Sequence, residues 1–438
     1  MQLYVWNELG PAERRRVLSR PALADDASVR AKVAGIIERV RADGDRALVE
    51  LAQELDGARV GALEVTAAEF PSAEARLDAA AKQAIRAAAA NIETFHRAQL
   101  PAPLRIETAP GVSCERVWRP LRSVGLYVPA GSAPLPSTAL MLGIPARLAG
   151  CPVRILCSPP RADGSVDPAV LYAAQTSGIA RVFKIGGAQA IAAMAYGTAS
   201  VPKVDKVFGP GSVWVTEAKA QVERDPEGAA RDYPAGPSEV LVIADARARA
   251  DFVAADLLSQ AEHGADSQVV LVTTSATLGY AVMRAIDEQK LKLLRRKAID
   301  GALAHSSIVV VDDVAEALEL ANAYAPEHLI LQVESPRLWL DGVQSAGSVF
   351  LGTWAPESVG DYCSGTNHVL PTYGYAHRYS SLGVGDFLRA MTVQELSREG
   401  LENIGPVAVT LARLEGLDAH AEAVLRRLSS SHAAGEPS

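Results

Sequence analysis

Residues 249–273, RADFVAADLLSQAEHGADSQVVLVT, contain the two patterns from which the fold can be predicted. The amphipathic run from Arg249 to Leu258 is typical of a helix, and the apolar run from Val269 to Val272 is typical of a buried strand. Between them, Ser259-Gln260-Ala261-Glu262-His263-Gly264 predicts the C-terminal end of the helix and a turn at Gly264. We therefore predict a helix-to-strand connection, the joint from which α/β sheets are built.

Polar side chains stand at this predicted joint. Gln260 and His263 are three residues apart, so on the last turn of a helix they would share a face. An amide oxygen and an imidazole at the negative end of a helix dipole are suited to hold a cation. The alternative interpretation is a helix that ends in an ordinary polar turn.

The same alternation of strands and helices extends on both sides of this stretch. We predict a first series of strands at 124–128, 153–157, 181–185 and 203–208, and a second series at 239–243, 268–273, 308–311, 329–332 and 348–351. Helices are predicted between the strands, an order that favours parallel sheets covered by helices. The predicted fold class is α/β, with two Rossmann-like parallel-sheet domains in tandem, a helical N-terminal region and a helical C-terminal tail.

The domain boundaries follow from changes in this pattern. We predict a helical N-terminal region over 1–105, a first Rossmann-like domain over 106–236, a second over 237–380 and a helical tail over 381–438. In the first region, Asp25 and Asp26 can cap a helix, and Pro71 opens an alanine-rich helix that runs to about Gln99.

Composition excludes several classes of protein. The net charge is −8 over 438 residues and the pI is near 5.6, so a nucleic-acid-binding surface is not expected. No run of about 18 apolar residues and no secretory signal pattern is present, so we expect no membrane span and a cytoplasmic location. The four cysteines form no CxxC pair, which disfavours a zinc–thiolate site.

Glycine-rich turns follow three strands of the first domain. They are Gly131-Ser132, Gly186-Gly187 and Gly209-Pro210-Gly211-Ser212, all at the predicted carboxyl ends of strands. Open α/β sheets bind ligands at this edge, and glycine allows the backbone to approach phosphate groups. The full GxGxxG fingerprint is absent, so nucleotide binding and ordinary tight turns both remain open.

The second domain carries its polar residues at the other edge. Glu327 and His328 precede a predicted strand, as Gln260 and His263 do, so both pairs would lie at the amino ends of parallel strands. We therefore predict that the amino edge of the second sheet faces the carboxyl edge of the first. The alternative is two unrelated helix ends.

The irregular segment 352–368 contains Asp361 and is of the length and composition of a functional loop.

Several of these segments together resemble the histidinol dehydrogenase family. The resemblance lies in GPSEVL (236–241), DLLSQAEHG (256–264), APEHL (325–329), GSVFLG (347–352), GDY (360–362) and SGTNHVLPT (364–372). It extends over nearly the whole chain in the same order. The family oxidises L-histidinol to L-histidine in two NAD-dependent steps through an aldehyde, at the end of histidine biosynthesis. Its members are zinc enzymes and homodimers with intertwined tails.

The resemblance implies a role for each matching position. Catalytic bases would be Glu327 and His328. The zinc ligands would be Gln260, His263, Asp361 and His420, the last from the partner subunit, so that the two copies share their active sites. Substrate contacts would come from Ser238, Gln260, His263, His328, Asp361, Glu415 and His420.

NAD contacts implied by the resemblance would involve Tyr127, Gln189 and Ser212. The family has asparagine at the last position, and a serine hydroxyl has a shorter reach. Two alternatives remain open: a paralogue that oxidises another small polar alcohol, and a zinc hydrolase in which Glu327 activates water.

Overall fold

The computed structural model describes residues 1–21, 27–130, 133–234 and 236–430, so the predicted cap residues Asp25 and Asp26 and the turn residues Gly131 and Ser132 lie outside the described residues. The chain divides into two compact units. The first comprises residues 1–99 and 121–387, and the second comprises residues 100–120 and those from 388 onward. We describe each unit separately.

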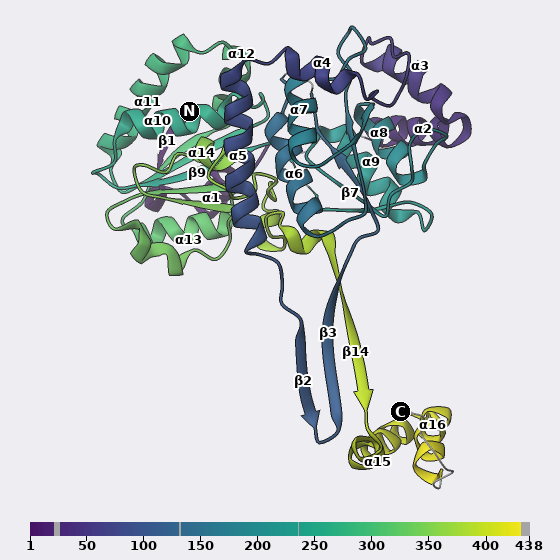
Figure 1. The fold of residues 1–438 in the computed structure, drawn as a ribbon. Coiled ribbons are helices and arrows are strands. Elements are labelled where there is room, and N and C mark those ends of the chain that lie inside the picture. The colour runs from purple at the N-terminus through teal and green to yellow at the C-terminus, as the bar shows by residue number, and fades with distance from the viewer. Residues whose placement is uncertain (22–26, 131–132, 235, 431–438) are drawn as a thin grey trace. The chain divides into compact units, whose positions relative to one another are not determined.

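The first α/β domain has a five-stranded parallel sheet in the order β6-β5-β4-β7-β8. Its strands are β4 (Ser123–Tyr127), β5 (Val153–Ser158), β6 (Arg181–Lys184), β7 (Lys206–Phe208) and β8 (Ala230–Arg231). Its helices are α6 (Pro136–Leu148), α7 (Pro168–Thr176), α8 (Gly187–Tyr196) and α9 (Val213–Arg224). Helices α6, α7, α8 and α9 lie around this sheet (Figure 1). Strand β4 is buried along its whole length, as expected for a parallel sheet covered on both faces.

The second domain repeats this plan with one added strand. Its parallel sheet has the order β1-β11-β10-β9-β12-β13. The strands are β9 (Glu239–Ala244), β10 (Gln268–Thr273), β11 (Ser307–Val310), β12 (His328–Gln332) and β13 (Ser348–Leu351), with β1 (Gln2–Val5) at the edge. If β1 is set aside, both sheets have their strands in the order 3-2-1-4-5 along the chain. The prediction of two Rossmann-like domains in tandem is therefore confirmed.

Alternate residues of β9 pack on opposite faces of the second sheet. Val240 and Val242 belong to the core under α10 (Ala250–Ala261), α11 (Ala276–Gln289) and α12 (Arg296–Ala304). Leu241 and Ile243 belong to the core under α13 (Val314–Tyr324). Burial on both faces explains why the strands appear in the sequence as continuous apolar runs. Among the helices predicted between strands, the one before β13 is instead a 3₁₀ helix, Pro336–Gly342.

The N-terminal region is mostly helical, with two differences from the prediction. Its helices are α1 (Pro11–Val17), α2 (Ala27–Asp43), α3 (Asp45–Leu55), α4 (Glu69–Ala75) and α5 (Ala79–Arg97). The single helix predicted from Pro71 to Gln99 is two helices, because Asp78 accepts a hydrogen bond from the Ala81 amide and begins a new helix there. Strand β1 was not predicted.

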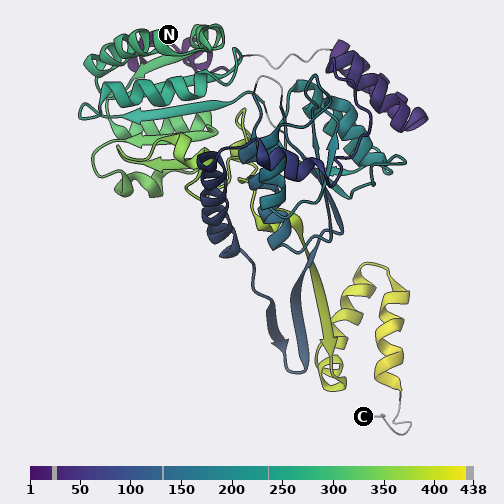
Figure 2. The same ribbon diagram turned by 45° about the horizontal axis from the view of Figure 1, so that its top comes forward.

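The second unit contains an antiparallel sheet that the sequence did not predict. Its strands are β2 (Leu104–Ala109), β3 (Val112–Pro120) and β14 (Leu388–Leu396), in the order β14-β3-β2. The tail predicted to be helical from residue 381 therefore contains a nine-residue strand before α15 (Arg398–Leu414) and α16 (Asp418–Ser429). These two helices pack side by side (Figure 2). None of the helices in the described part of the chain is long and apolar enough to cross a membrane.

Candidate active site

The candidate site lies at the amino edge of the second sheet, where β9 and β12 run side by side. Helix α13 ends at Ala325, whose φ of 51° is in the left-handed region, and Pro326 then prevents the helix from continuing. The chain therefore turns sharply and begins β12 at His328, with Glu327 just before it. The backbone N–H of Glu239 donates to Oε2 of Glu327 over 2.8 Å, which fixes this carboxyl group against β9.

His328 lies between the other polar groups of the site. Its Nδ1 atom lies 2.7 Å from Nε2 of Gln260 and 3.0 Å from the carbonyl oxygen of Glu239. Its Nε2 atom lies 3.2 Å from Oδ1 of Asp361, which is on the short helix α14 (Glu357–Tyr362). Both sides of the imidazole ring are therefore held by residues from different elements.

Burial and charge act in opposite directions on these groups. Burial raises the pKa of Glu327 well above its usual range, although His328 next to it partly offsets this effect. Burial opposes the charged form of His328, but Glu327 and Asp361 outweigh it and raise the pKa of the imidazole. Burial also acts to raise the pKa of Asp361, and the neighbouring histidines outweigh it and lower that pKa. The pKa of each of these three groups is therefore set by its charged neighbours as well as by burial.

A cavity of about 230 Å³ opens beside these residues. It is lined on one side by the turn Gly209-Pro210-Gly211 at the carboxyl end of β7, and on the other by Ser238, His263 and Glu327 at the amino edge of the second sheet. The carboxyl edge of the first sheet thus faces the amino edge of the second across one cavity, as predicted.

The donor atoms of the second domain fit a metal ion. Oε1 of the fully buried Gln260 has no hydrogen-bond partner among the described residues, although an amide oxygen is costly to bury unpaired. Removal of water by the surrounding atoms lowers the pKa of His263, which favours the neutral imidazole that binds metals. Asp361 lies within electrostatic range of that ring. In the described part of the chain, no three His, Cys, Asp or Glu side chains are already grouped closely enough to hold a metal.

The predicted site residues do not all belong to one unit. Ser238, Gln260, His263, Glu327, His328 and Asp361 are in the first unit. Glu415 and His420 are in the second unit, and both are exposed. The helix α10 ends at Ala261, so His263 lies just beyond the helix and not on its last turn as predicted; a hydrogen bond from its N–H to the Gln260 carbonyl oxygen keeps the two residues close.

The predicted NAD contacts lie at the carboxyl edge of the first sheet. Tyr127 ends β4, and its hydroxyl oxygen accepts a hydrogen bond from the N–H of Gly187 over 3.0 Å. Gln189 is buried at the start of α8, with no partner for Oε1 among the described residues. Ser212 is exposed and precedes α9 without capping it through its side chain. A hydroxyl, an amide oxygen and an N-terminal helix end thus lie at the edge of the sheet where polar ligands bind in open α/β folds.

The turn after β7 is held by a buried ion pair. Gly209 has a φ of 123°, and a Cβ atom there would lie 2.2 Å from the Tyr127 carbonyl oxygen, so only glycine fits. Nζ of Lys219 donates to the carbonyl oxygen of Gly209 and to Oδ1 of Asp232, both over 2.6 Å. Oδ2 of Asp232 accepts from the Gly209 N–H. This pair was not recognised in the sequence, because its partners are separated from the turn and carry no motif.

Two further residues near the site were not assigned a role from the sequence. His368 places Nδ1 2.8 Å from the Asp361 carbonyl oxygen and lines the cavity. Glu357 is almost fully buried, accepts from the Ser259 hydroxyl, and has its pKa raised to about 8 by burial. Their positions in the polar segment 352–368 were the available signal, but that segment has no periodicity from which to infer where its side chains point.

Comparison with known proteins agrees with this geometry. The family model described as histidinol dehydrogenase matches residues 19–428. The histidinol dehydrogenase of Vibrio vulnificus strain YJ016 is 55% identical, over 98% of this chain and 98% of its own length. The histidinol dehydrogenase of Xanthomonas oryzae pv. oryzae is 56% identical, over 98% of this chain and 99% of its own length. The crystal structure of histidinol dehydrogenase from Elizabethkingia anophelis superposes with a TM-score of 0.94 at 44% identity, covering 98% of each chain.

Proposed function

Because the chain belongs to the histidinol dehydrogenase family, we propose that it oxidises L-histidinol to L-histidine through L-histidinal, with NAD as oxidant and zinc as resident metal. This reaction is the last step of histidine biosynthesis. Each of the two oxidations passes one hydride to one NAD, and one water oxygen enters the product carboxylate. The cavity between the glycine turn and the second sheet is the place where cofactor and substrate would meet.

The position of His328 is the observation on which the proposed mechanism rests. Its ring is oriented by Gln260 and Glu239 on one side and by Asp361 on the other. In its neutral form, a fixed imidazole of this kind can take the hydroxyl proton while a hydride leaves the same carbon. We therefore assign His328 as the base of the alcohol oxidation.

Glu327 suits the second oxidation. Its carboxyl group lines the cavity and is held by the Glu239 amide. Burial raises its pKa to about 8, and its ionised form is therefore a stronger proton acceptor than an exposed carboxylate and becomes more abundant as the pH rises. It would remove a proton from the water that adds to the aldehyde.

Gln260, His263 and Asp361 would hold zinc, and His420 of a second copy would complete the set. These are nitrogen and oxygen donors without thiolate, a combination found in zinc sites that remain open to substrate. When bound, zinc would supply a fixed positive point that orients the substrate's nitrogen atoms. In this proposal Ser238 and Glu415 contact the substrate, and Tyr127, Gln189 and Ser212 contact NAD.

The surface of the second unit supports a homodimer in which the two copies share their sites. Its helix α15 exposes Val407, Leu411 and Leu414 at helical spacing. Strand β14 adds Met391, Val393 and Leu396, which are each more than one-third exposed. An apolar surface of this kind marks an association site in many proteins. A second copy would cover it and bring Glu415 and His420 to a site.

A single assay tests the proposed reaction and the metal together. The measurement is the number of NADH molecules formed per L-histidinol, before and after treatment with a chelator and after zinc is restored. We expect two NADH, lost with the chelator and regained with zinc. One NADH per substrate would mean that the aldehyde is the product. Bound zinc without any NADH would favour the hydrolase alternative.

A further inference from the structure

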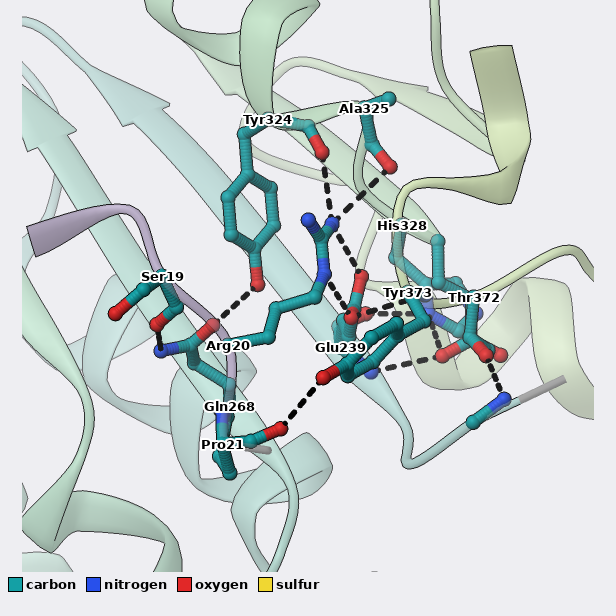
Figure 3. A network of polar contacts seen from close by, with 12 residues as sticks. Ser19, Arg20, Pro21, Glu239, Gln268, Tyr324, Ala325, His328, Thr372 and Tyr373 are labelled. Carbon is teal, nitrogen blue, oxygen red and sulfur yellow. Dashed lines mark hydrogen bonds and ion pairs between the residues drawn. The ribbon is translucent and has the colours of Figure 1, made fainter. Parts of the chain in front are cut away.

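The segment that follows α1 contacts residues at the candidate site. Arg20 forms a two-pronged ion pair with Glu239, with Nε 2.5 Å from Oε1 and Nη2 2.9 Å from Oε2 (Figure 3). Nη2 also donates to the carbonyl oxygen of Tyr324 over 2.7 Å, and the guanidinium lies 3.8 Å from the centre of the Tyr324 ring. The Glu239 side chain is only 2% exposed, so this pair is shielded from water.

Glu239 is the residue whose backbone orients the proposed catalytic groups. Its N–H donates to Glu327, and its carbonyl oxygen accepts from Nε2 of Gln260 over 3.2 Å and lies 3.0 Å from Nδ1 of His328. Its side chain therefore fixes a peptide segment that three site residues contact. A small shift of Glu239 would move all three.

Arg20 also contacts the turn that leads into Glu327. It donates to the carbonyl oxygens of Tyr324 and Ala325, at the C-terminal end of α13. Those carbonyl groups and the carboxylates of Glu239 and Glu327 concentrate negative charge at one edge of the sheet. A guanidinium with five donors can bond to the carboxylate and the carbonyl groups at the same time, which a lysine ammonium cannot match.

The residues on either side of Arg20 in the sequence also form hydrogen bonds to the second domain. The carbonyl oxygen of Ser19 accepts from Nε2 of Gln268 over 3.0 Å, and that of Pro21 accepts from the Tyr373 hydroxyl over 2.8 Å. The same Tyr373 donates its N–H to Oε1 of Glu239. The segment is thus bonded to the start of β10 and to the loop that follows the site (Figure 3).

We propose that Arg20 is a positioning residue of the enzyme, which holds Glu327 and His328 in their productive orientation through Glu239 and the Ala325 turn. It contacts neither substrate nor cofactor. The proposal rests on the function proposed above, because it assigns a consequence to the orientation of those two bases. It predicts that weakening the Arg20–Glu239 pair lowers catalysis more than it weakens the binding of substrate or metal.

The test compares Arg20→Lys with Arg181→Lys. Arg181 is a matched control because it forms the same two-pronged pair with Glu64, at 2.7 and 2.9 Å, and donates to the Ser200 carbonyl oxygen, away from the candidate site. Each protein is assayed as the zinc-loaded full chain, for kcat and KM with L-histidinol and for single turnovers with L-histidinal. Zinc content and the folded fraction are measured in the same samples.

For Arg20→Lys we expect kcat per folded molecule to fall about 10- to 100-fold, as for other ångström-scale displacements of catalytic groups. The loss should appear with both the alcohol and the aldehyde, because Glu239 contacts both His328 and Glu327. KM for L-histidinol and zinc content should change much less than kcat, and Arg181→Lys should keep wild-type kcat. If Arg20→Lys also keeps wild-type kcat per folded molecule, the proposal is overturned.

A second variant keeps the proposal testable if Arg20→Lys does not fold. Glu239→Gln removes the charge from the pair but keeps the backbone contacts to Glu327 and Gln260, and it should show the same loss of kcat, larger than any change in KM. Wild-type kcat in Glu239→Gln would overturn the proposal. Failure of the proposed function would be recognised separately, because wild type itself would then not form two NADH per L-histidinol.

Discussion

Nε2 of His328 lies 3.2 Å from Oδ1 of Asp361, so one of the proposed bases is paired with one of the proposed zinc ligands. The carboxylate is shared between two tasks, holding the metal and orienting the imidazole. Base and metal site are therefore coupled through one side chain. The predictions below separate the parts of this arrangement.

The two bases should act in different half-reactions. His328→Asn should slow oxidation of L-histidinol by about 10²- to 10⁴-fold, the usual range for loss of a general base. Glu327→Gln should spare formation of the aldehyde and slow its conversion to the acid. Single-turnover assays started from alcohol and from aldehyde distinguish the two. Equal losses of both variants in both half-reactions would contradict the assignment.

Shared sites predict that two inactive variants restore activity when mixed. His328→Asn damages the site on the first unit, and His420→Ala damages the residue that a second copy would contribute. Each variant alone should be nearly inactive, and His420→Ala should also bind less zinc. After unfolding and refolding together, hybrid dimers would contain one intact site. Activity of the mixture no greater than the sum of its parts would argue against exchange of His420 between copies.

Ser212→Asn should strengthen NAD binding. Ser212 is exposed at the start of α9, beside the turn held by Lys219 and Asp232, and an asparagine there adds a second hydrogen-bonding group with longer reach. KM for NAD should fall while KM for L-histidinol stays unchanged, and steady-state kinetics with each substrate varied in turn would measure both. An unchanged KM for NAD would place the cofactor away from residue 212.

Asp256→Asn should stabilise the protein at neutral pH. Burial raises the pKa of Asp256 to about 6, an effect that a hydrogen bond from Gln332 only partly offsets. The folded protein therefore holds this proton more tightly than the unfolded chain, whose carboxyl group ionises near pH 4. The free energy of unfolding must fall as pH rises from about 4 to about 6, by about 2–3 kcal/mol from this group.

Asparagine does not ionise, so the variant should lose that decline. Denaturant unfolding at pH 4 and pH 7.5 would show a larger gain from the substitution at the higher pH. Asp163→Asn is a control for which the effect of pH should have the opposite sign. Ser165 donates two hydrogen bonds that lower the pKa of Asp163, so this substitution should be less favourable at the higher pH. If Asp256→Asn raises the free energy of unfolding equally at both pH values, ionisation of Asp256 does not destabilise the folded protein.

Apolar runs were sufficient to predict the two parallel sheets except for their edge strands β1 and β8. Strands such as β10, buried on both faces, leave an unbroken run of apolar residues in the sequence. Strands β2 and β14 are mostly exposed and pair only within a three-stranded sheet, so no such pattern was available. Strand β1 has four residues and depends on a partner about 300 positions away. Its formation is decided by tertiary contacts.

The candidate site was predictable in part. The joints at Gln260 and Glu327 could be placed on one sheet edge from topology, but Asp361 was linked to them only through family resemblance. Arg20 could not be found, because its partner Glu239 is 219 residues away and a single arginine after a short helix carries no pattern.

The pairing of Gln2 with Ser307 also limits the order in which parts of the protein can fold during synthesis. A ribosome adds about 5–20 residues per second, so the first strand waits roughly 15–60 s before its neighbour exists. The first α/β domain can fold during that interval, whereas the second cannot close its outer edge. The amino end of the chain is therefore the first part synthesised and among the last to reach its native place.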